Sequence, residues 1–197
     1  MRRFNLYFGL GTVALLVLVG VFAPWLAPHD PITFSDLNNA QLPPGPGFPF
    51  GTDEQGRDML SRILYGARVS LIVGLVVQLM NTFVGVTLGM TAGYFGGWWD
   101  EIVQGLTNLM LAIPTIVFAL ALMTILGPGL LSLFIALGLT DWAYSCRVSR
   151  AQVLSQKSQN YVQAAETMGF STGHVIFPEI LPNVAGPLVV IATMGVG

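Results

Sequence analysis

Residues 161–182 read YVQAAETMGFSTGHVIFPEILP and form a polar island between long apolar runs. Four residues recur at the spacing of one helical face: Tyr161, Ala164, Ala165 and Met168. This spacing predicts a short helix that ends at Gly169, since glycine lacks the Cβ that resists a left-handed turn. Two alanines and a glycine on this helix would let another backbone approach closely. The alternative is an ordinary amphipathic loop helix.

A second short helix is predicted over residues 172–177. Ser171 precedes it and is of the residue type that caps helix N-termini. Pro178 and Pro182 are expected to end this helix and to start the next element, because proline cannot donate a backbone hydrogen bond. The two helices together predict a compact knob at a membrane surface.

The stretch resembles the "EAA" loop of bacterial ABC importer permeases, in which Glu-Ala-Ala is followed by a glycine and then by Leu-Pro. The matching residues here are Gln163, Ala164, Ala165, Gly169, Ile180, Leu181 and Pro182. The resemblance implies a cytoplasmic coupling helix that docks into a groove of an ATPase subunit. Gln163 replaces the usual glutamate, so one expected charge contact is missing. Glu179 stands where an apolar residue is common.

The composition is that of an integral membrane protein. The chain has 197 residues, of which 53% are hydrophobic and only 9% charged, whereas soluble domains carry about a quarter charged residues. A net charge of −2 argues against nucleic acid as a partner. The single cysteine excludes an internal disulfide, and neither a metal-binding spacing nor a catalytic or phosphate-binding motif is present.

Long uncharged runs predict the membrane spans, since about 20 apolar residues cross a bilayer. The expected spans are 4–28, 69–99, 102–126 with a kink at Pro114, 130–146, and a fifth that begins at residue 180 and does not finish. A signal peptide is the alternative for the first run. Basic residues flank two of these spans: Arg2 and Arg3 precede the first, and Arg147, Arg150 and Lys157 follow the fourth. This places the start of the first span and the end of the fourth in the cytoplasm.

Gly85, Gly89 and Gly93 repeat every four residues within the second predicted span. This pattern is typical of a face on which another helix packs closely. A flexible gate is the alternative.

Between the first two spans, residues 29–66 are rich in acids, prolines and glycines, which indicates an exposed segment with little regular structure. Within it, residues 48–74 resemble a signature of the dipeptide/oligopeptide/nickel branch of these permeases. Its core is Gly51, Thr52, Asp53, Gly56, Arg57 and Asp58. We expect Thr52 or Asp53 to cap a helix and Arg57 to pair with an acid, so that the segment is a packing device on the outer face rather than a ligand site.

The fold expected from these observations is an all-α, polytopic helix bundle. The resemblance implies a type I ABC importer permease with about five of six spans, incomplete at its C-terminus. Residues 1–66 would form the first span and a periplasmic segment. Residues 67–197 would form the permease core, with the coupling loop at 155–182.

The resemblance further implies an importer subunit in a bacterial or archaeal inner membrane, with the N-terminus in the cytoplasm. Its partners would be a second homologous permease, two ATPase subunits that bind ATP and magnesium, and a substrate-binding protein. Di- and oligopeptides are the expected cargo; nickel or another small solute is the alternative.

Asp141 is the one carboxylate within a predicted span. It is a candidate for the transport pathway, although a local pairing with Arg147 is favoured. Two alternatives to an importer subunit come from other functional classes: an ion-coupled secondary transporter and a structural membrane subunit without a pathway. An ion-coupled transporter would need ionisable groups inside the spans for the coupling ion, or inverted repeats with broken helices. Only Asp141 meets the first requirement, and the two halves of the sequence do not repeat.

Overall fold

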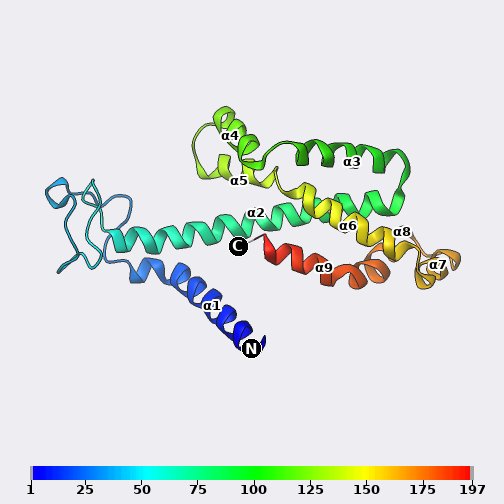
Figure 1. Ribbon diagram of the computed structural model, residues 1–197, viewed down its shortest axis with the longest axis horizontal. Helices are drawn as coiled ribbons and strands as arrows, with labels where there is room; N and C mark the ends of the chain where they lie inside the picture. Colours follow the sequence, from blue (N-terminus) through cyan, green and yellow to red (C-terminus); the bar gives the residue numbers. More distant parts are fainter. Residues whose placement is uncertain (1, 196–197) are drawn as a thin grey trace. The chain divides into compact units, whose positions relative to one another are not determined.

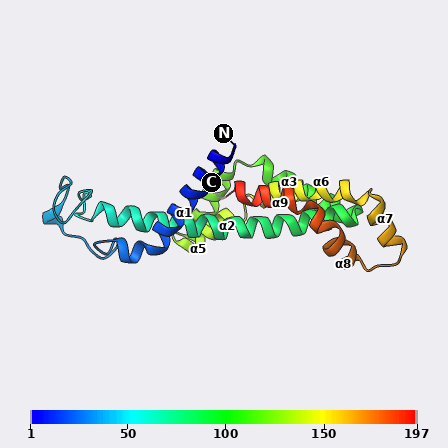
Figure 2. The same cartoon turned by 90° about the horizontal axis from the view of Figure 1, so that it is seen from below.

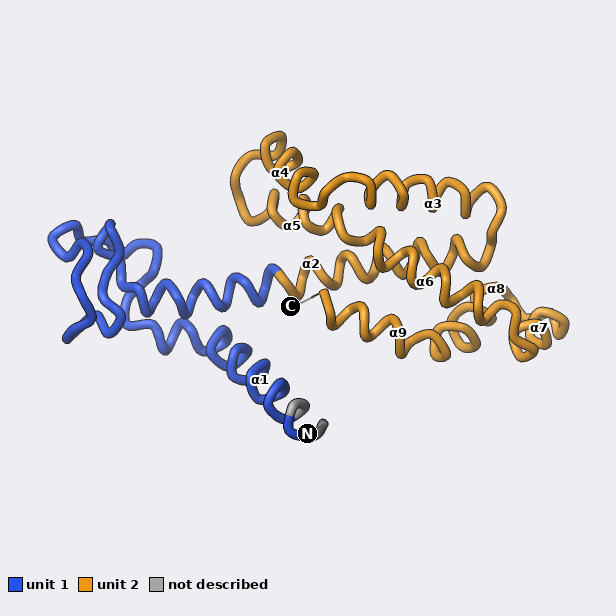
Figure 3. Tube along the Cα trace, in the orientation of Figure 1, with its two compact units in different colours: residues 1–73 blue, residues 74–197 orange. Residues whose placement is uncertain are grey.

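The computed structural model describes residues 2–195, which divide into unit 1, residues 1–73, and unit 2, residues 74–197. Within the described range the regular elements are helical and no strand occurs, which confirms the all-α prediction (Figures 1 and 3). The elements are α1 (Arg2–Leu26), η1 (Leu37–Asn39), α2 (Met59–Phe95), α3 (Gly97–Ala112), α4 (Thr115–Leu126), α5 (Leu130–Gly138), α6 (Trp142–Lys157), α7 (Asn160–Thr167), α8 (Thr172–His174), η2 (Val175–Ile180) and α9 (Leu181–Met194).

Unit 1 consists of α1, an irregular segment and the first part of α2. Gly20 lies against the backbone of Arg68 and the side chain of Leu71, because glycine leaves room for this close approach. Most of the apolar side chains of α1 are exposed, as expected for a helix that faces lipid. The side chains of Arg2 and Arg3 lie outside the described part of the chain.

Unit 2 is built around α6, which packs beside α2, α3 and α9 (Figure 1). A Cβ at Gly85 or Gly89 would collide with α6, and one at Gly93 would press tightly against Arg150 and Val153. The three glycines therefore form a close-packing face, as their spacing predicted. Buried Ala143, Cys146 and Val103 complete the contact between α6 and its neighbours.

Two of the predicted spans, 4–28 and 69–99, are single long helices, and the fifth lies within a continuous helical run. Residues 7–26 of α1 and the whole of α2 are apolar and long enough to cross a membrane, and so is the run from α8 to α9, residues 172–194. The helix α2 begins at Met59, ten residues before the predicted uncharged span.

The other two predicted spans are broken. Helices α3 and α4 meet at an angle of 92° across Ile113 and Pro114, so the expected kink is a full interruption. The predicted span 130–146 is wrong as a continuous helix, because α5 ends at Gly138 and α6 begins at Trp142. The hydroxyl of Thr140 bonds the carbonyl of Leu137 at 2.7 Å, a local side-chain bond of the kind that competes with helix continuation.

Candidate functional site

The coupling segment, residues 155–182, contains a helix whose C-terminus is closed by a glycine. The amide of Gly169 donates to the carbonyl of Glu166 at 3.0 Å, and the amide of Phe170 donates to the carbonyl of Ala165 at 3.2 Å. This pair of bonds is a Schellman motif, which needs a left-handed residue at its centre. Gly169 has φ +79°, as the sequence predicted. The glycine therefore sets the direction in which the chain leaves α7.

The inner side of α7 differs from the predicted face. Val162 and Ala165 are buried, whereas Ala164 and Met168 are exposed. Ala165 belongs to an apolar core with residues of α2, α6, η2 and α9, among them Met90, Val153, Val175, Ile180 and Val184. The methyl group of Ala165 is therefore packed inside this chain, whereas that of Ala164 is exposed.

The second predicted helix is longer than expected. Ser171 caps it, as predicted, through a bond from the amide of His174 to its hydroxyl oxygen at 3.4 Å. Pro178 does not end the helix but lies inside the π-helical turn η2. A wider turn suits proline, whose ring would strike the carbonyl four residues earlier in an α-helix. Helical structure thus runs from Thr172 through Pro182 to Met194.

Polar bonds tie the coupling segment to α2 and α6. The hydroxyl of Tyr94 donates to Glu166 at 3.0 Å, and the ammonium of Lys157 donates to the carbonyl of Tyr94 at 2.6 Å. The hydroxyl of Tyr161 donates to Gln156 at 2.7 Å. Burial, and then the negative charge of Glu179, raise the pKa of Tyr161, so this phenol stays protonated and able to donate.

The coupling segment lies at one end of unit 2 (Figures 1 and 2). Its outer side is a mixed polar and apolar surface. Its exposed side chains are Gln163, Ala164, Glu166, Thr167, Met168, Phe170, His174 and Phe177. Met168 and Phe177 are each about two-thirds exposed, at 67% and 66%. Exposed large apolar groups beside polar ones are typical of a protein-binding surface. Ile180 is buried and Leu181 half-buried, so the Leu-Pro end of the motif supports this surface from inside.

The signature segment, residues 51–58, is held by backbone approaches that only glycine allows. Gly51 and Gly56 have φ +74° and +70°. A Cβ at Gly51 would collide with the carbonyl oxygen of Leu42, and one at Gly56 with that of Asp36. The oxygen of Thr52 accepts from the amide of Leu42 at 2.8 Å.

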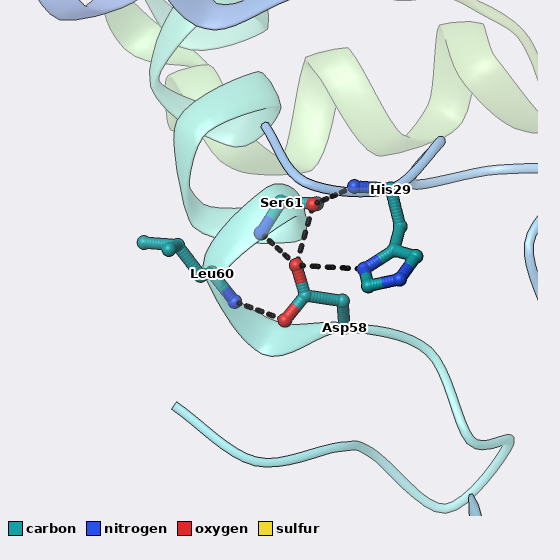
Figure 4. Close-up of polar contacts among 4 residues, drawn as sticks. All are labelled: His29, Asp58, Leu60 and Ser61. Carbon is teal, nitrogen blue, oxygen red and sulfur yellow. Dashed lines mark hydrogen bonds and ion pairs between the residues drawn. The ribbon is translucent and has the colours of Figure 1, made fainter. Parts of the chain in front are cut away.

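Asp58 begins α2. Its carboxylate accepts from the amides of Leu60 at 3.3 Å and Ser61 at 3.0 Å, and from the hydroxyl of Ser61 at 2.5 Å (Figure 4). His29 lies beside the same carboxylate, with 3.7 Å between its Nδ1 and Oδ2 of Asp58. The N-cap of α2 is therefore Asp58, whereas the sequence suggested Thr52 or Asp53.

Asp53 organises the turn that precedes this cap. Its carboxylate accepts from the amides of Arg57 at 2.9 Å and Gln55 at 2.8 Å, and it pairs with the guanidinium of Arg62. The backbone bond from Arg57 is the largest cause of a lowered pKa of Asp53. The predicted pairing of the Arg57 side chain with an acid is wrong, since Nε of Arg57 is buried without a hydrogen bond among the described residues.

Asp141 does not pair with Arg147. Its Oδ1 accepts from the hydroxyl of Thr115 at 3.3 Å, and Arg147 donates to Oδ1 of Asn108 at 2.8 Å. Both ionisable side chains are exposed in unit 2. The expected local ion pair is therefore absent from the described residues, where Arg150 pairs with Asp100 instead.

Several contributors to these sites escaped the sequence reasoning. They are His29, Ser61 and Arg62 at the signature segment, and Tyr94, Lys157 and Val162 at the coupling segment. Asp58 is of a residue type that caps helix N-termini and directly precedes a long, largely apolar run, so this signal for the cap was present in the sequence. The other contacts join residues far apart in the chain or of common types.

Comparison with known proteins agrees with this description. Residues 85–197 match a family described as the binding-protein-dependent transport system inner membrane component. Residues 7–44 match the N-terminal TM domain of oligopeptide transport permease C.

Individual relatives are similar over almost the whole chain. The chain is 40% identical to the probable D,D-dipeptide transport system permease protein DdpC of Escherichia coli, over 94% of this chain and 62% of the relative. It is 36% identical to the oligopeptide transport system permease protein OppC of Bacillus subtilis, over 95% and 61%. It is also 35% identical to the glutathione transport system permease protein GsiD of Shigella dysenteriae, over 94% and 61%. The chain thus spans about three-fifths of the length of these relatives.

Proposed function

Since the chain belongs to the family of binding-protein-dependent transport system inner membrane components, we propose that it forms part of the membrane pathway of an ATP-driven importer of short peptides. The relatives named for D,D-dipeptides, oligopeptides and glutathione support peptides as the cargo. Substrate would arrive from a separate binding protein. A second, homologous permease would complete the pathway.

The observation that supports this function most is the construction of the coupling segment. Its outer side exposes Met168, Phe170 and Phe177, and its inner side is packed into the helices of unit 2. We propose that two partner ATPase subunits, which bind ATP and magnesium, receive such outer sides. Because helical structure continues from α8 into α9, a force applied at the outer side would tilt α9 as one body. ATP binding would thereby favour one of two pathway states.

We propose that the coupling segment faces the cytoplasm, together with the N-terminus of the chain. The clustering of Arg150 and Lys157 at this end of α6 supports that orientation. The signature segment, which leads into the other end of α2, would then face the outside and form a fixed platform there.

The test is uptake by proteoliposomes that hold the complete complex. We expect uptake of trialanine that requires ATP, the ATPase subunits and the binding protein together. Uptake driven by a proton gradient without the ATPase subunits would contradict the proposal and favour an ion-coupled carrier. Uptake of nickel with no uptake of trialanine would replace the cargo but keep the mechanism.

A further inference from the structure

Two helix breaks meet at one place in unit 2. One break separates α3 from α4 at Ile113 and Pro114, and the other separates α5 from α6. The hydroxyl of Thr115, at the start of α4, donates to Asp141, at the start of α6, across 3.3 Å. Backbone groups at such breaks have lost their helical partners. Within a bilayer they are tolerated where protein buries them or where they line a water-filled cavity.

Unit 2 buries these breaks only in part, since Thr140 is buried and Ile113 is half-buried. Pro114, Thr115, Leu139 and Asp141 are all exposed. Pro114 and Asp141 are the N-cap residues of α4 and α6, and neither gives its helix a side-chain cap bond. The carboxylate of Asp141 is therefore not used to close its own helix, and Oδ2 of Asp141 has no recorded bond among the described residues.

The breaks lie deep relative to the polar end of α6. Arg150 bonds Asp100 at 2.5 Å, next to the aromatic pair Trp98 and Trp99, whose side chains mark an interface. Asp141 precedes Arg150 by nine residues, a rise of about 14 Å along a helix. This distance is close to half of a hydrocarbon core of about 30 Å. An ionisable group at that depth faces a bundle interior or water rather than lipid.

We call the line of contact between α6 and the helices α3 and α4 the seam. A cationic group lies along it, beside the two breaks. Arg147 is exposed and donates to Asn108 of α3 at 2.8 Å, as Asp141 accepts from Thr115 of α4. Asp141 and Arg147 are six residues apart, a rise of about 9 Å. A fully extended peptide of three residues reaches up to about 10 Å. Along α6 the two residues are therefore separated by about the length of a short peptide.

We propose that this seam is a transit site for zwitterionic peptides, in which Asp141 with Thr115 receives the terminal ammonium and Arg147 with Asn108 receives the terminal carboxylate. The inference rests on the proposed importer function and adds the groups that contact the cargo. Elsewhere the exposed surfaces of α2, α3 and α9 are largely apolar, so the seam is where unit 2 offers ionisable groups at membrane depth.

Peptides blocked at one terminus test the Asp141 end and the Arg147 end of the site separately. Proteoliposomes with the complete complex are given trialanine, its N-acetyl derivative or its C-terminal amide, each at saturation of the binding protein. We expect Arg147→Gln to reduce the wild-type preference for trialanine over its amide about tenfold, the loss of one charged hydrogen bond. Asp141→Asn should reduce the preference over the N-acetyl form equally, and Arg147→Lys should restore part of the first preference.

The control is Glu101→Gln, which removes an exposed charge of α3 outside the seam and should leave every preference unchanged. ATP hydrolysis stimulated by the binding protein should also be unchanged in Glu101→Gln. Wild-type uptake that is equal for all three peptides would overturn the proposal. So would seam variants that keep the wild-type preferences, or that lose hydrolysis and all uptake together.

A second measurement does not depend on transport. Asp141→Cys in a Cys146→Ala background should react with a membrane-impermeant thiol reagent in the complete complex. A position that no aqueous reagent reaches would show that lipid or another helix covers the seam, and would overturn the site whatever the cargo. If Asp141→Cys reacts but no peptide is taken up with ATP, the site remains water-lined and the proposed importer function fails instead.

Discussion

The signature segment and the coupling segment are both short and polar, yet they are held in opposite ways. The first is fixed by hydrogen bonds and by backbone contacts at glycines, with Asp53 and Asp58 at its centre. The second is fixed by an apolar core that includes Val162 and Ala165. Hydrogen bonds set one geometry and resist change, whereas a packed core can move as a body with the helices it joins. Under the proposed function, this difference would suit a fixed signature segment and a movable coupling segment.

Gly56→Ala should have the largest effect of any single methyl group in either segment. Its Cβ would collide with the carbonyl of Asp36, and its backbone has φ +70°. We expect a loss of about 3 kcal/mol or more in the free energy of unfolding, from overpacking and left-handed strain together. Thermal melting of the purified complex measures it. Gly47→Ala is the control, with φ +88° and open space around it; an equal loss there would contradict the collision.

Asp58→Ala should have the next largest effect, because it removes the cap of α2. The amides of Leu60 and Ser61 would lose their acceptor. We expect a loss of about 2 kcal/mol in the free energy of unfolding. Glu54→Ala, at an exposed acid of the same segment, should change melting little. Equal shifts in both variants would mean that net charge, rather than the cap, is what matters.

Gly169→Ala should be milder than Gly56→Ala, and this contrast separates the two segments. No atom lies within 4 Å of a Cβ built at Gly169, so only the strain of φ +79° remains. We expect about 1 kcal/mol, at the lower end for a left-handed residue. If Gly169→Ala lowered the free energy of unfolding as much as Gly56→Ala, the space around Gly169 would have to be filled rather than open.

Acid should weaken the signature segment, and this effect should be the smallest. The amide of Arg57, and then Gln55 and Arg62, hold the pKa of Asp53 below its usual value. The stabilisation is present above the ordinary pKa of aspartate and is lost as the pH falls through the lowered value. Hydrogen exchange at the amide of Arg57 should therefore rise at acidic pH. Asp53→Asn should remove this pH dependence, and exchange in wild type that is independent of pH would contradict it.

The helical class and the spans of α1 and α2 follow from composition and from uncharged runs. The close packing at Gly85, Gly89 and Gly93 follows from spacing alone. The break between α5 and α6 does not, because Leu139, Thr140 and Asp141 interrupt a run that is apolar enough for one helix. Hydropathy measures how well a residue tolerates lipid but carries little information on whether the backbone is continuous there.

In the coupling segment, periodicity alone is insufficient to predict which face of α7 is buried. Tyr161, Ala164, Ala165 and Met168 share a helical face by spacing, but a helix of eight residues can turn that face by one position without breaking the pattern. Val162 of α7 and Ile180 of η2, buried in the same core, settle the rotation. Long-range contacts of this kind, like those of Tyr94 with Glu166, are set by the tertiary fold.

The central claim is that the coupling segment has a structural inner side and a free outer side for docking, and two neighbouring alanines test it most directly. Ala165 is 2% exposed, and its neighbour Ala164 is exposed. In the complete complex, Ala164→Trp should leave the melting temperature unchanged and abolish ATP hydrolysis stimulated by the binding protein. Ala165→Trp should lower the melting temperature, because the ring overpacks the core by about 1–3 kcal/mol. Normal stimulated hydrolysis in Ala164→Trp, together with normal melting in Ala165→Trp, would contradict the account.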